Sequence, residues 1–182
     1  MSTTRHRRRP AAVALIAIFL LTIIPALPVA ANSNPQPLPF SQDWTDTSLI
    51  VTADDWSTVP GVVGFLGQNL TTATGIDPQT VVTDSTVAGD VDVRADQPEA
   101  NIIDGGVAEF QGANFPDPVV ALQGSGTADA PHMVLNLDTT ARANVSVAYN
   151  LRDIDDTTDN AVQPIALQYR VGNKVRVFQC SG

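Results

Sequence analysis

The sequence is poor in the residues that crosslink a chain or build a catalytic centre. Cys180 is the only cysteine, so no intramolecular disulfide can form and packing must hold the fold. Of the two histidines only His132 lies beyond residue 31, which excludes a histidine-based metal cluster within one chain. A Ser-His-Asp triad would have to use His132, and no Gly-x-Ser-x-Gly motif is present. We therefore expect a chain that is not an enzyme.

Positive charge is scarce as well. Four of the ten basic residues precede residue 10, whereas all nineteen acidic residues lie beyond residue 31, so the chain without its first 31 residues has a net charge of −13. Binding of phosphate backbones needs clustered Lys and Arg, which makes nucleic acid an unexpected partner for this chain alone. The acidity fits an extracellular protein and could recruit divalent cations.

The N-terminus has the three-part layout of a secretory signal. A cluster of arginines precedes an apolar run over residues 11–24, two prolines end that run, and small residues lead up to Ala31. We predict that residues 1–31 are a signal peptide, that cleavage follows Ala31, and that the remainder is secreted without a membrane attachment. The alternative is an uncleaved helix that anchors the chain, because residues 11–31 could span about 30 Å of hydrocarbon.

The rest of the chain has a composition typical of strands and turns, with no helical period. Residues 32–39 are a proline-rich spacer, and about 150 residues are enough for one sizeable core, so residues 40–182 are predicted to be one domain. Apolar and polar residues alternate in several short segments, which indicates strands. The expected strands are residues 48–53, 62–68, 108–113, 119–123, 133–137, 144–154 and 165–171. Turns are expected at residues 77–78, 104–106, 116–118, 124–126 and 138–140.

Short alternating strands separated by polar turns predict an all-β fold. The fold class that we expect is an antiparallel, jelly-roll-like β-sandwich that follows the N-terminal signal helix. One face of each sheet would be packed and the other solvated.

Four segments resemble a module found near the start of large secreted bacterial proteins. They are "LPFSQDW", "WSTVPGVVGFLGQ", "PHMVLNLDTT" and "VSVAYNLRDIDDTTDNAVQPIALQYRVG". Such proteins continue into endonuclease/exonuclease/phosphatase-type nuclease domains or into lamin-tail domains. The resemblance covers residues 38–172 and implies a jelly-roll-like accessory module rather than a catalytic unit. Relatives continue through further strands, so this chain is expected to be truncated, and its open sheet edge is expected to favour self-association.

The last ten residues differ in composition from the rest. Residues 173–182 hold the only lysine and the only cysteine of the chain. One interpretation is that the reading frame breaks near Asn173, which would make this stretch an aberrant tail. The other is an ordinary final strand that carries Val175 and Val177.

The stretch "RDIDDTTDN" concentrates acidic residues between two expected strands. A hairpin turn is the favoured interpretation, because Asp and Asn bond nearby backbone and tolerate left-handed conformations. A structural calcium site is the alternative, since calcium takes six to eight oxygen ligands. The candidate calcium ligands are Asp153, Asp155, Asp156 and Asp159.

Other acidic and aromatic residues have two interpretations each. Asp54-Asp55 is read as a solvated turn or as an addition to the calcium site, and Asp90 with Asp92 as an exposed strand face. Trp44 and Trp56 are expected to fill the core, although exposed side by side they would form a sugar platform.

Taken together, the residues favour a secreted, non-catalytic module for binding or presentation at the cell surface. A glycan or a cell-envelope polymer is the ligand that we favour. The alternative is a remnant or accessory part of a secreted, nuclease-type hydrolase whose catalytic domain is missing from this chain.

Overall fold

The structure is a computed structural model that describes residues 32–71, 75–83, 88–100, 102, 104–154, 164–171 and 174–177. It is all-β: the described residues form nine strands in several small sheets, and the helical elements among them are two short 3₁₀ turns. These are η1 (Pro78–Thr80) and η2 (Ala88–Asp90). No helix within the described ranges is long and apolar enough to cross a membrane. The predicted signal helix lies outside these ranges.

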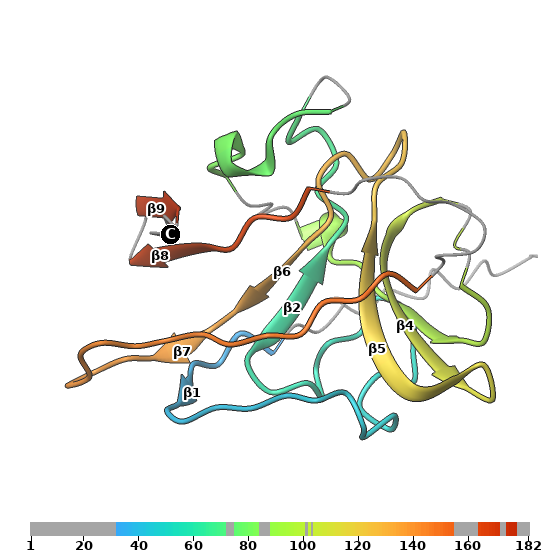
Figure 1. Cartoon of the computed structure of the whole chain (residues 1–182), viewed down its shortest axis with the longest axis horizontal. Helices are drawn as coiled ribbons and strands as arrows, with labels where there is room; N and C mark the ends of the chain where they lie inside the picture. The colour runs from blue at the N-terminus through green and yellow to red at the C-terminus, as the bar shows by residue number, and fades with distance from the viewer. Residues whose placement is uncertain are drawn as a thin grey trace, which may run out of the picture.

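Two sheets make up the body of the molecule (Figure 1). In the first, β2 (Val62–Phe65) pairs antiparallel with β6 (His132–Leu135). The second has the order β3–β4–β5 and is formed by β3 (Arg94–Gln97), β4 (Gly106–Gly112) and β5 (Phe115–Gln123). Strand β4 runs antiparallel to β5 and parallel to β3, so the pairing is mixed. A single bridge from Phe65 to Val91 connects β2 with the segment that leads into β3.

Two smaller pairs complete the described strands. β1 (Gln36–Pro37), which lies within the predicted spacer, runs parallel to β7 (Leu137–Asp138). β8 (Gln168–Val171) and β9 (Lys174–Val177) form an antiparallel hairpin. The side-chain amide of Gln168 donates to the carbonyl oxygens of Pro78 and Val81, at 3.1 and 3.0 Å, which ties this hairpin to the η1 turn.

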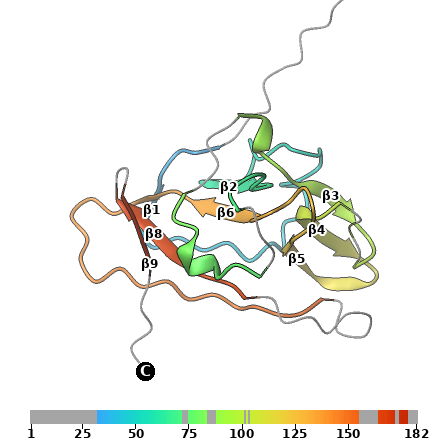
Figure 2. The ribbon, with the colours of Figure 1, turned by 90° about the horizontal axis from the view of Figure 1, so that it is seen from above.

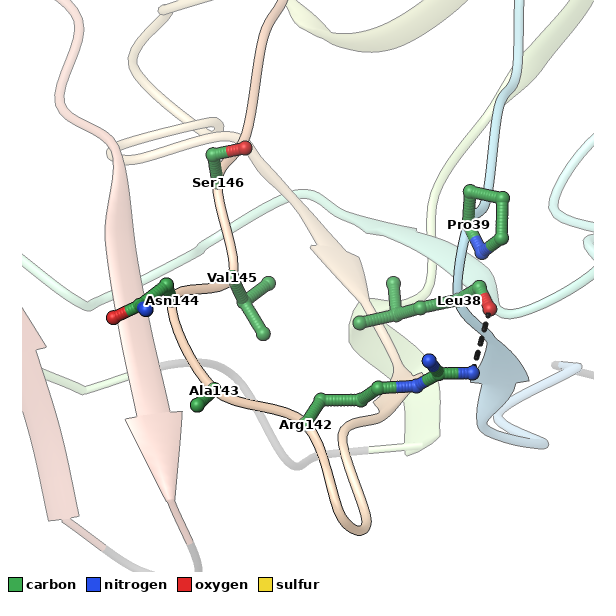
Figure 3. Close-up of a pocket in the computed structure, with 7 residues that line it drawn as sticks. All are labelled: Leu38, Pro39, Arg142, Ala143, Asn144, Val145 and Ser146. Carbon is green, nitrogen blue, oxygen red and sulfur yellow. Dashed lines mark hydrogen bonds between the residues drawn. The ribbon is translucent and has the colours of Figure 1, made fainter.

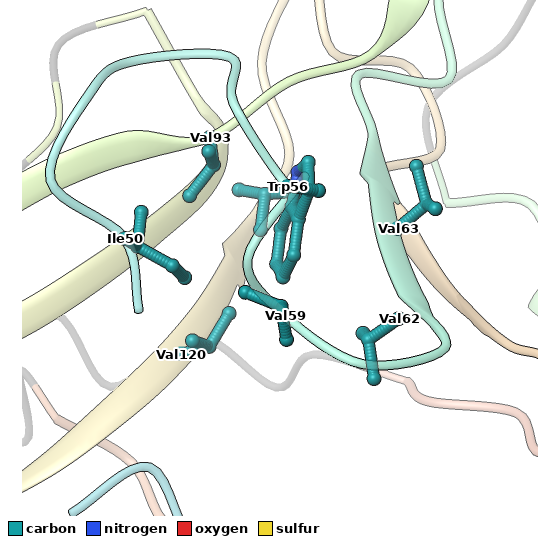
Figure 4. Packing of buried hydrophobic residues seen from close by; sticks show 8 residues of the cluster. Ile50, Trp56, Val59, Val62, Val63, Val93 and Val120 are labelled. Atoms are coloured by element: carbon teal, nitrogen blue, oxygen red, sulfur yellow. The ribbon is translucent and has the colours of Figure 1, made fainter. Parts of the chain in front are cut away.

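The main core lies between the two larger sheets, around the fully buried side chain of Trp56 (Figure 4). Its buried members are Ile50, Trp56, Val59, Val62, Val63, Val93, Val107 and Val120. A second cluster gathers Ile102, Ala108, Phe110 and Phe115. Neighbouring residues of a strand point to opposite faces, so Val107 and Ala108 place the two clusters on opposite faces of β4. β4 is therefore buried on both faces over residues 106–110, which explains its largely apolar sequence, whereas β5 is buried only in part.

Several predicted strands are confirmed. β4 covers most of residues 108–113, β5 includes 119–123, and β6 with β7 covers 133–137. Residues 62–68 and 165–171 are strands over part of their length, in β2 and β8. Residues 124–126 lie outside the strands, as expected, with a bend at Gly126.

Two local predictions are wrong. Residues 48–53 form turns instead of a strand, held by bonds such as the one from the Leu49 amide to the Asp46 carbonyl at 3.3 Å. The expected turn at residues 116–118 lies inside β5. Pro116 and Pro118 are tolerated there because β5 is an edge strand that, among the described strands, pairs only with β4. No further described strand lies on its outer side, so a missing N–H on that side removes no hydrogen bond between strands.

The strand predicted over residues 144–154 is also wrong. The chain is extended there but belongs to no sheet, and residues 144–153 are all exposed. In Figures 1 and 2 this orange segment runs past β6 and β5 and stands to one side of the β2–β6 pair. Alternation of side chains is a local property, whereas a strand also needs a neighbour within hydrogen-bonding distance, and this segment has none among the described residues.

Candidate functional site

The predicted calcium ligands fall mostly outside the described part of the chain. Asp153 is exposed at the end of the extended segment, whereas Asp155, Asp156 and Asp159 lie outside the described residues. Within the described ranges, no three His, Cys, Asp or Glu side chains gather where a metal ion could bind. Asp54 and Asp55 do not change this, so the calcium site remains a prediction that concerns the loop after Asp153.

Asp90 and Asp92 were expected on an exposed strand face, and this prediction is wrong. Asp90 is buried, and its carboxylate accepts hydrogen bonds from the amides of Gly67 and Gln68, at 3.1 and 3.3 Å. Asp92 is half-buried, and its Oδ2 accepts from the Val107 amide at 2.6 Å. Both carboxylates satisfy backbone donors of distant segments, which is why these acidic side chains point inward.

Asp92 connects three parts of the core. Its backbone amide donates to the Gly64 carbonyl of β2 at 3.0 Å, and its side chain holds the Val107 amide of β4. Burial raises the pKa of the Asp92 carboxyl above its usual value, an effect that the bond from Val107 opposes and the charge of Asp54 reinforces. The geometry identifies Asp92 as a structural residue that joins the two sheets.

Glu109 is the second carboxyl with a raised pKa. Its side chain is 1% exposed within β4, and burial is the main cause of the rise. A hydrogen bond from the Asp96 amide, at 3.4 Å, opposes the shift, while the Asp96 carboxylate adds to it. Glu109 is not among the residues predicted from the sequence; the available signal was a single Glu inside the apolar run of residues 107–110.

His132 is at the start of β6 and half-buried. Its ring stacks on Phe65 with centroids 5.2 Å apart and planes inclined by 18°. Nδ1 lies 2.8 Å from the Ala130 carbonyl, while the buried Nε2 has no hydrogen-bond partner among the described residues. The ring thus packs against its cross-strand partner Phe65 on one face of the β2–β6 sheet. Among the described residues, no serine or carboxylate forms a hydrogen bond with it.

The tryptophans fill the core, which confirms the favoured interpretation. Trp56 is fully buried, and its Nε1 donates to the Asp92 carbonyl at 3.0 Å. Trp44 is half-buried and meets Trp56 edge to face, with centroids 6.4 Å apart. Two rings arranged in this way offer no exposed platform for a sugar.

The surface feature that stands out is the stretch Asn144–Leu151, which we call the exposed segment. One row of its side chains is apolar, and these side chains keep 40 to 62% of their surface exposed. The apolar row consists of Val145, Val147, Tyr149 and Leu151. The other row, which starts at Asn144 and includes Ser146 and Asn150, is exposed too. A segment with both rows in solvent contributes little to the core and is available for contacts.

Both ends of the exposed segment are tethered to the body. Before it, the Arg142 guanidinium donates to the Leu38 carbonyl at 3.4 Å, beside a shallow hollow of about 260 Å³ (Figure 3). After it, Arg152 forms an ion pair with Asp117 at 3.2 Å and also donates to the Asp117 carbonyl. Ile154 packs against the second core cluster. The segment is therefore fixed at its ends, while its middle is presented to solvent.

Comparisons with known proteins add no identification. No family model, curated protein or solved structure matches the chain. The resemblance to an accessory module of large secreted proteins therefore remains a prediction from the sequence.

Proposed function

We propose that this chain is an exported, non-catalytic module that binds a polymer of the cell surface through the exposed segment. The observation that carries the proposal is the presentation of Tyr149, 55% exposed, between two tethered ends of an extended chain. A flat surface strip of this kind suits a long ligand better than a small molecule, which needs a concave pocket.

The chemistry of the exposed segment favours an uncharged glycan. The Tyr149 ring offers an apolar face for stacking together with a polar hydroxyl. Asn144 and Asn150 provide amide groups that both donate and accept hydrogen bonds, as sugar hydroxyls require. The net charge of −13 beyond residue 31 would repel an anionic polymer, so a neutral polysaccharide is the ligand that we propose.

We also propose that the two larger sheets belong to an antiparallel, jelly-roll-like sandwich. This is supported by the main core, in which Val62 of β2, Val107 of β4 and Val120 of β5 belong to one buried cluster around Trp56. The exposed segment would then lie at the rim of the second sheet, where binding surfaces of accessory sandwiches can be built without disturbing the core.

A sedimentation assay with insoluble neutral polysaccharides tests the binding proposal. Purified chain from residue 32 onward is expected to sediment with at least one of them, Tyr149→Ala to lose most of the binding, and Tyr149→Phe to keep it because the ring remains. Val51→Ala, which shortens another exposed apolar side chain, serves as the matched control and is expected to bind normally. Equal binding by Tyr149→Ala and the unmodified chain, or no binding at all, would refute the proposal.

A further inference from the structure

The backbone of the exposed segment has unused hydrogen-bonding capacity. Each of its eight residues carries one N–H donor and one C=O acceptor, since none is a proline. Within the described part of the chain, residues 144–151 form no backbone hydrogen bond. Asn144 is a bend with a φ of +55°, and the chain after it is extended (Figure 1). An extended strand with free donors and acceptors is a template for a further strand. We propose that a second copy of this chain supplies that strand, through antiparallel pairing of the two exposed segments.

The sequence of the segment is complementary to itself in one antiparallel register. When Ala148 lies opposite Ala148 of the second copy, Val145 lies opposite Leu151 and Val147 opposite Tyr149. Aromatic and β-branched side chains placed directly opposite each other stabilise a strand pair by roughly 0.2–1 kcal/mol per pair. This two-fold arrangement therefore aligns the whole apolar row of one copy with that of the other.

The neighbouring registers are less favourable. A shift by one residue places apolar side chains opposite polar ones, because the side-chain period is two. A shift by two residues in one direction sets Arg142 opposite Arg152, and in the other direction sets Val145 opposite Asp153. In the register centred on Ala148, Arg152 faces Asn144 instead, and no like charges stand directly opposite. The charges that flank the segment thus select a single register.

The distribution of charge also favours this surface for contact between copies. Residues 32–141 contain fifteen acidic residues and one basic residue, which gives a net charge of −14. Residues 142–182 contain four acidic and five basic residues, a net charge of +1, and residues 144–151 contain no charge. Two copies that approach through the exposed segment therefore bring together the part of the sequence that repels itself least.

The proposed pairing goes beyond the proposed function and does not depend on it. Strand pairing rests on backbone groups at one edge of the segment, and the contact between Val147 and Tyr149 adds to it, whereas polysaccharide binding requires the Tyr149 ring and the amide side chains. The two can fail separately, because Tyr149→Ala reports on polysaccharide binding, whereas crosslinking through residue 148 reports on the pairing and leaves Tyr149 unchanged.

Cysteine crosslinking tests the register directly. The variants are Ala148→Cys and Asn144→Cys, each made with Cys180→Ser so that one thiol is present per chain. Opposed residues of an antiparallel pair have Cα atoms about 5 Å apart, which allows a disulfide, whereas the two copies of residue 144 would be about 27 Å apart. Under mild oxidation, Ala148→Cys is expected to give a covalent dimer on a non-reducing gel, and Asn144→Cys to remain monomeric. Equal crosslinking of both variants, or of neither, would overturn the proposal.

Sedimentation velocity gives a second, independent measurement. The Cys180→Ser chain is expected to double its mass as its concentration rises, and Val147→Lys to remain a monomer, since it places an ammonium opposite Tyr149. Val51→Lys, at an exposed site outside the segment, is the matched control and is expected to dimerise normally. Circular dichroism is used to check that both lysine variants keep the spectrum of the unmodified chain. A Val147→Lys variant that is folded and dimerises as well as Val51→Lys would show that the contact lies elsewhere.

Discussion

Trp56 and Asp92 are joined by a hydrogen bond from the indole Nε1 to the backbone carbonyl, at 3.0 Å, across 36 residues of sequence. The backbone amide of Asp92 is bonded to Gly64 in β2, and its carboxylate to Val107 in β4. The largest side chain of the core is thus fixed to the residue that joins the two sheets. Removal of the indole should therefore affect both sheets.

Replacement of Trp56 by Phe is expected to lower the free energy of unfolding by about 2–3 kcal/mol, because it leaves a cavity and an unpaired carbonyl. Trp44→Phe is the control and is expected to cost less than half as much, since Trp44 is only half-buried and, among the described residues, its indole donates no hydrogen bond to the core. Urea unfolding followed by circular dichroism measures both changes. Equal losses for the two variants would contradict the role assigned to Trp56.

Gly106 is expected to be intolerant of alanine for two reasons. Its φ of +103° is a conformation that residues with a Cβ rarely adopt, and an added Cβ would collide with Oδ2 of Asp92. Gly106→Ala should lower the free energy of unfolding by roughly 3 kcal/mol.

Two other glycines distinguish the effect of the positive φ from the effect of the collision with Asp92. Gly112 has a φ of +100° but open space around it, so Gly112→Ala should cost roughly 1 kcal/mol through the backbone alone. Gly89 has neither constraint, and Gly89→Ala should leave stability unchanged or slightly increase it. Thermal unfolding of the three variants gives their order; a Gly106→Ala variant no less stable than Gly112→Ala would exclude the collision.

Neutralisation of Glu109 is expected to stabilise the chain at neutral pH. Burial raises the pKa of Glu109 above 4.5, so the folded chain retains a proton that the unfolded chain has released. Stability linked to this group is fully present below about pH 4.5 and is lost as the pH rises through the folded pKa. Glu109→Gln should therefore be more stable than the unmodified chain by about 1 kcal/mol at pH 7 and should lose this advantage near pH 4.

Urea unfolding at a series of pH values measures this difference. Glu99→Gln removes the same charge from an exposed position, so it corrects for the general relief of repulsion in an acidic chain. A pH-dependent gain of the same size in both variants would show that net charge, and not the burial of Glu109, is the cause.

A calcium titration distinguishes the two interpretations of the stretch after Arg152. We expect millimolar calcium to leave the melting temperature unchanged, because turns alone account for the Asp and Asn content. Bound calcium would instead raise it by an amount that grows with the ratio of calcium concentration to dissociation constant. Loss of such a rise in an Asp155→Asn, Asp156→Asn double variant, with magnesium as the control ion, would establish the metal site.

Export is tested by the mass of the product. Expression of the full chain in a secreting bacterial host should release a protein whose N-terminal residue is Asn32. Ala31→Asp should prevent cleavage, because a charged residue does not fit the small-residue position, whereas Ala31→Ser should not. An unmodified chain that stays in the membrane fraction with Met1 intact would support the anchored alternative.

The strands that the sequence predicted correctly are of two kinds. Some pair with the next strand along the chain, and others bury one face and expose the other. β4 and β5 are consecutive, and Met133 and Leu135 alternate with the half-buried His132 and Val134 in β6. The pattern over residues 144–151 is just as regular, yet no neighbour pairs with it. Alternation encodes which side chains share a face, but the presence of a partner strand depends on the rest of the fold.

The polar residues of the core were not predictable for a related reason. The alternation of Asp90, Val91, Asp92 and Val93 suggested that the carboxylates face solvent. They point inward because the amides that they satisfy belong to Gly67 and Val107, which are 23 and 15 residues away. The sequence shows that carboxylates are present at residues 90 and 92. It does not show which distant backbone amides donate hydrogen bonds to them.

Pro116 and Pro118 limit how far copies of this chain could stack. Neither residue can donate a backbone hydrogen bond, so the first half of the outer edge of β5 cannot serve as a continuous ladder for an incoming strand. Growth of a fibril requires such a ladder at every layer. Copies of the chain should therefore not seed amyloid along this edge of β5.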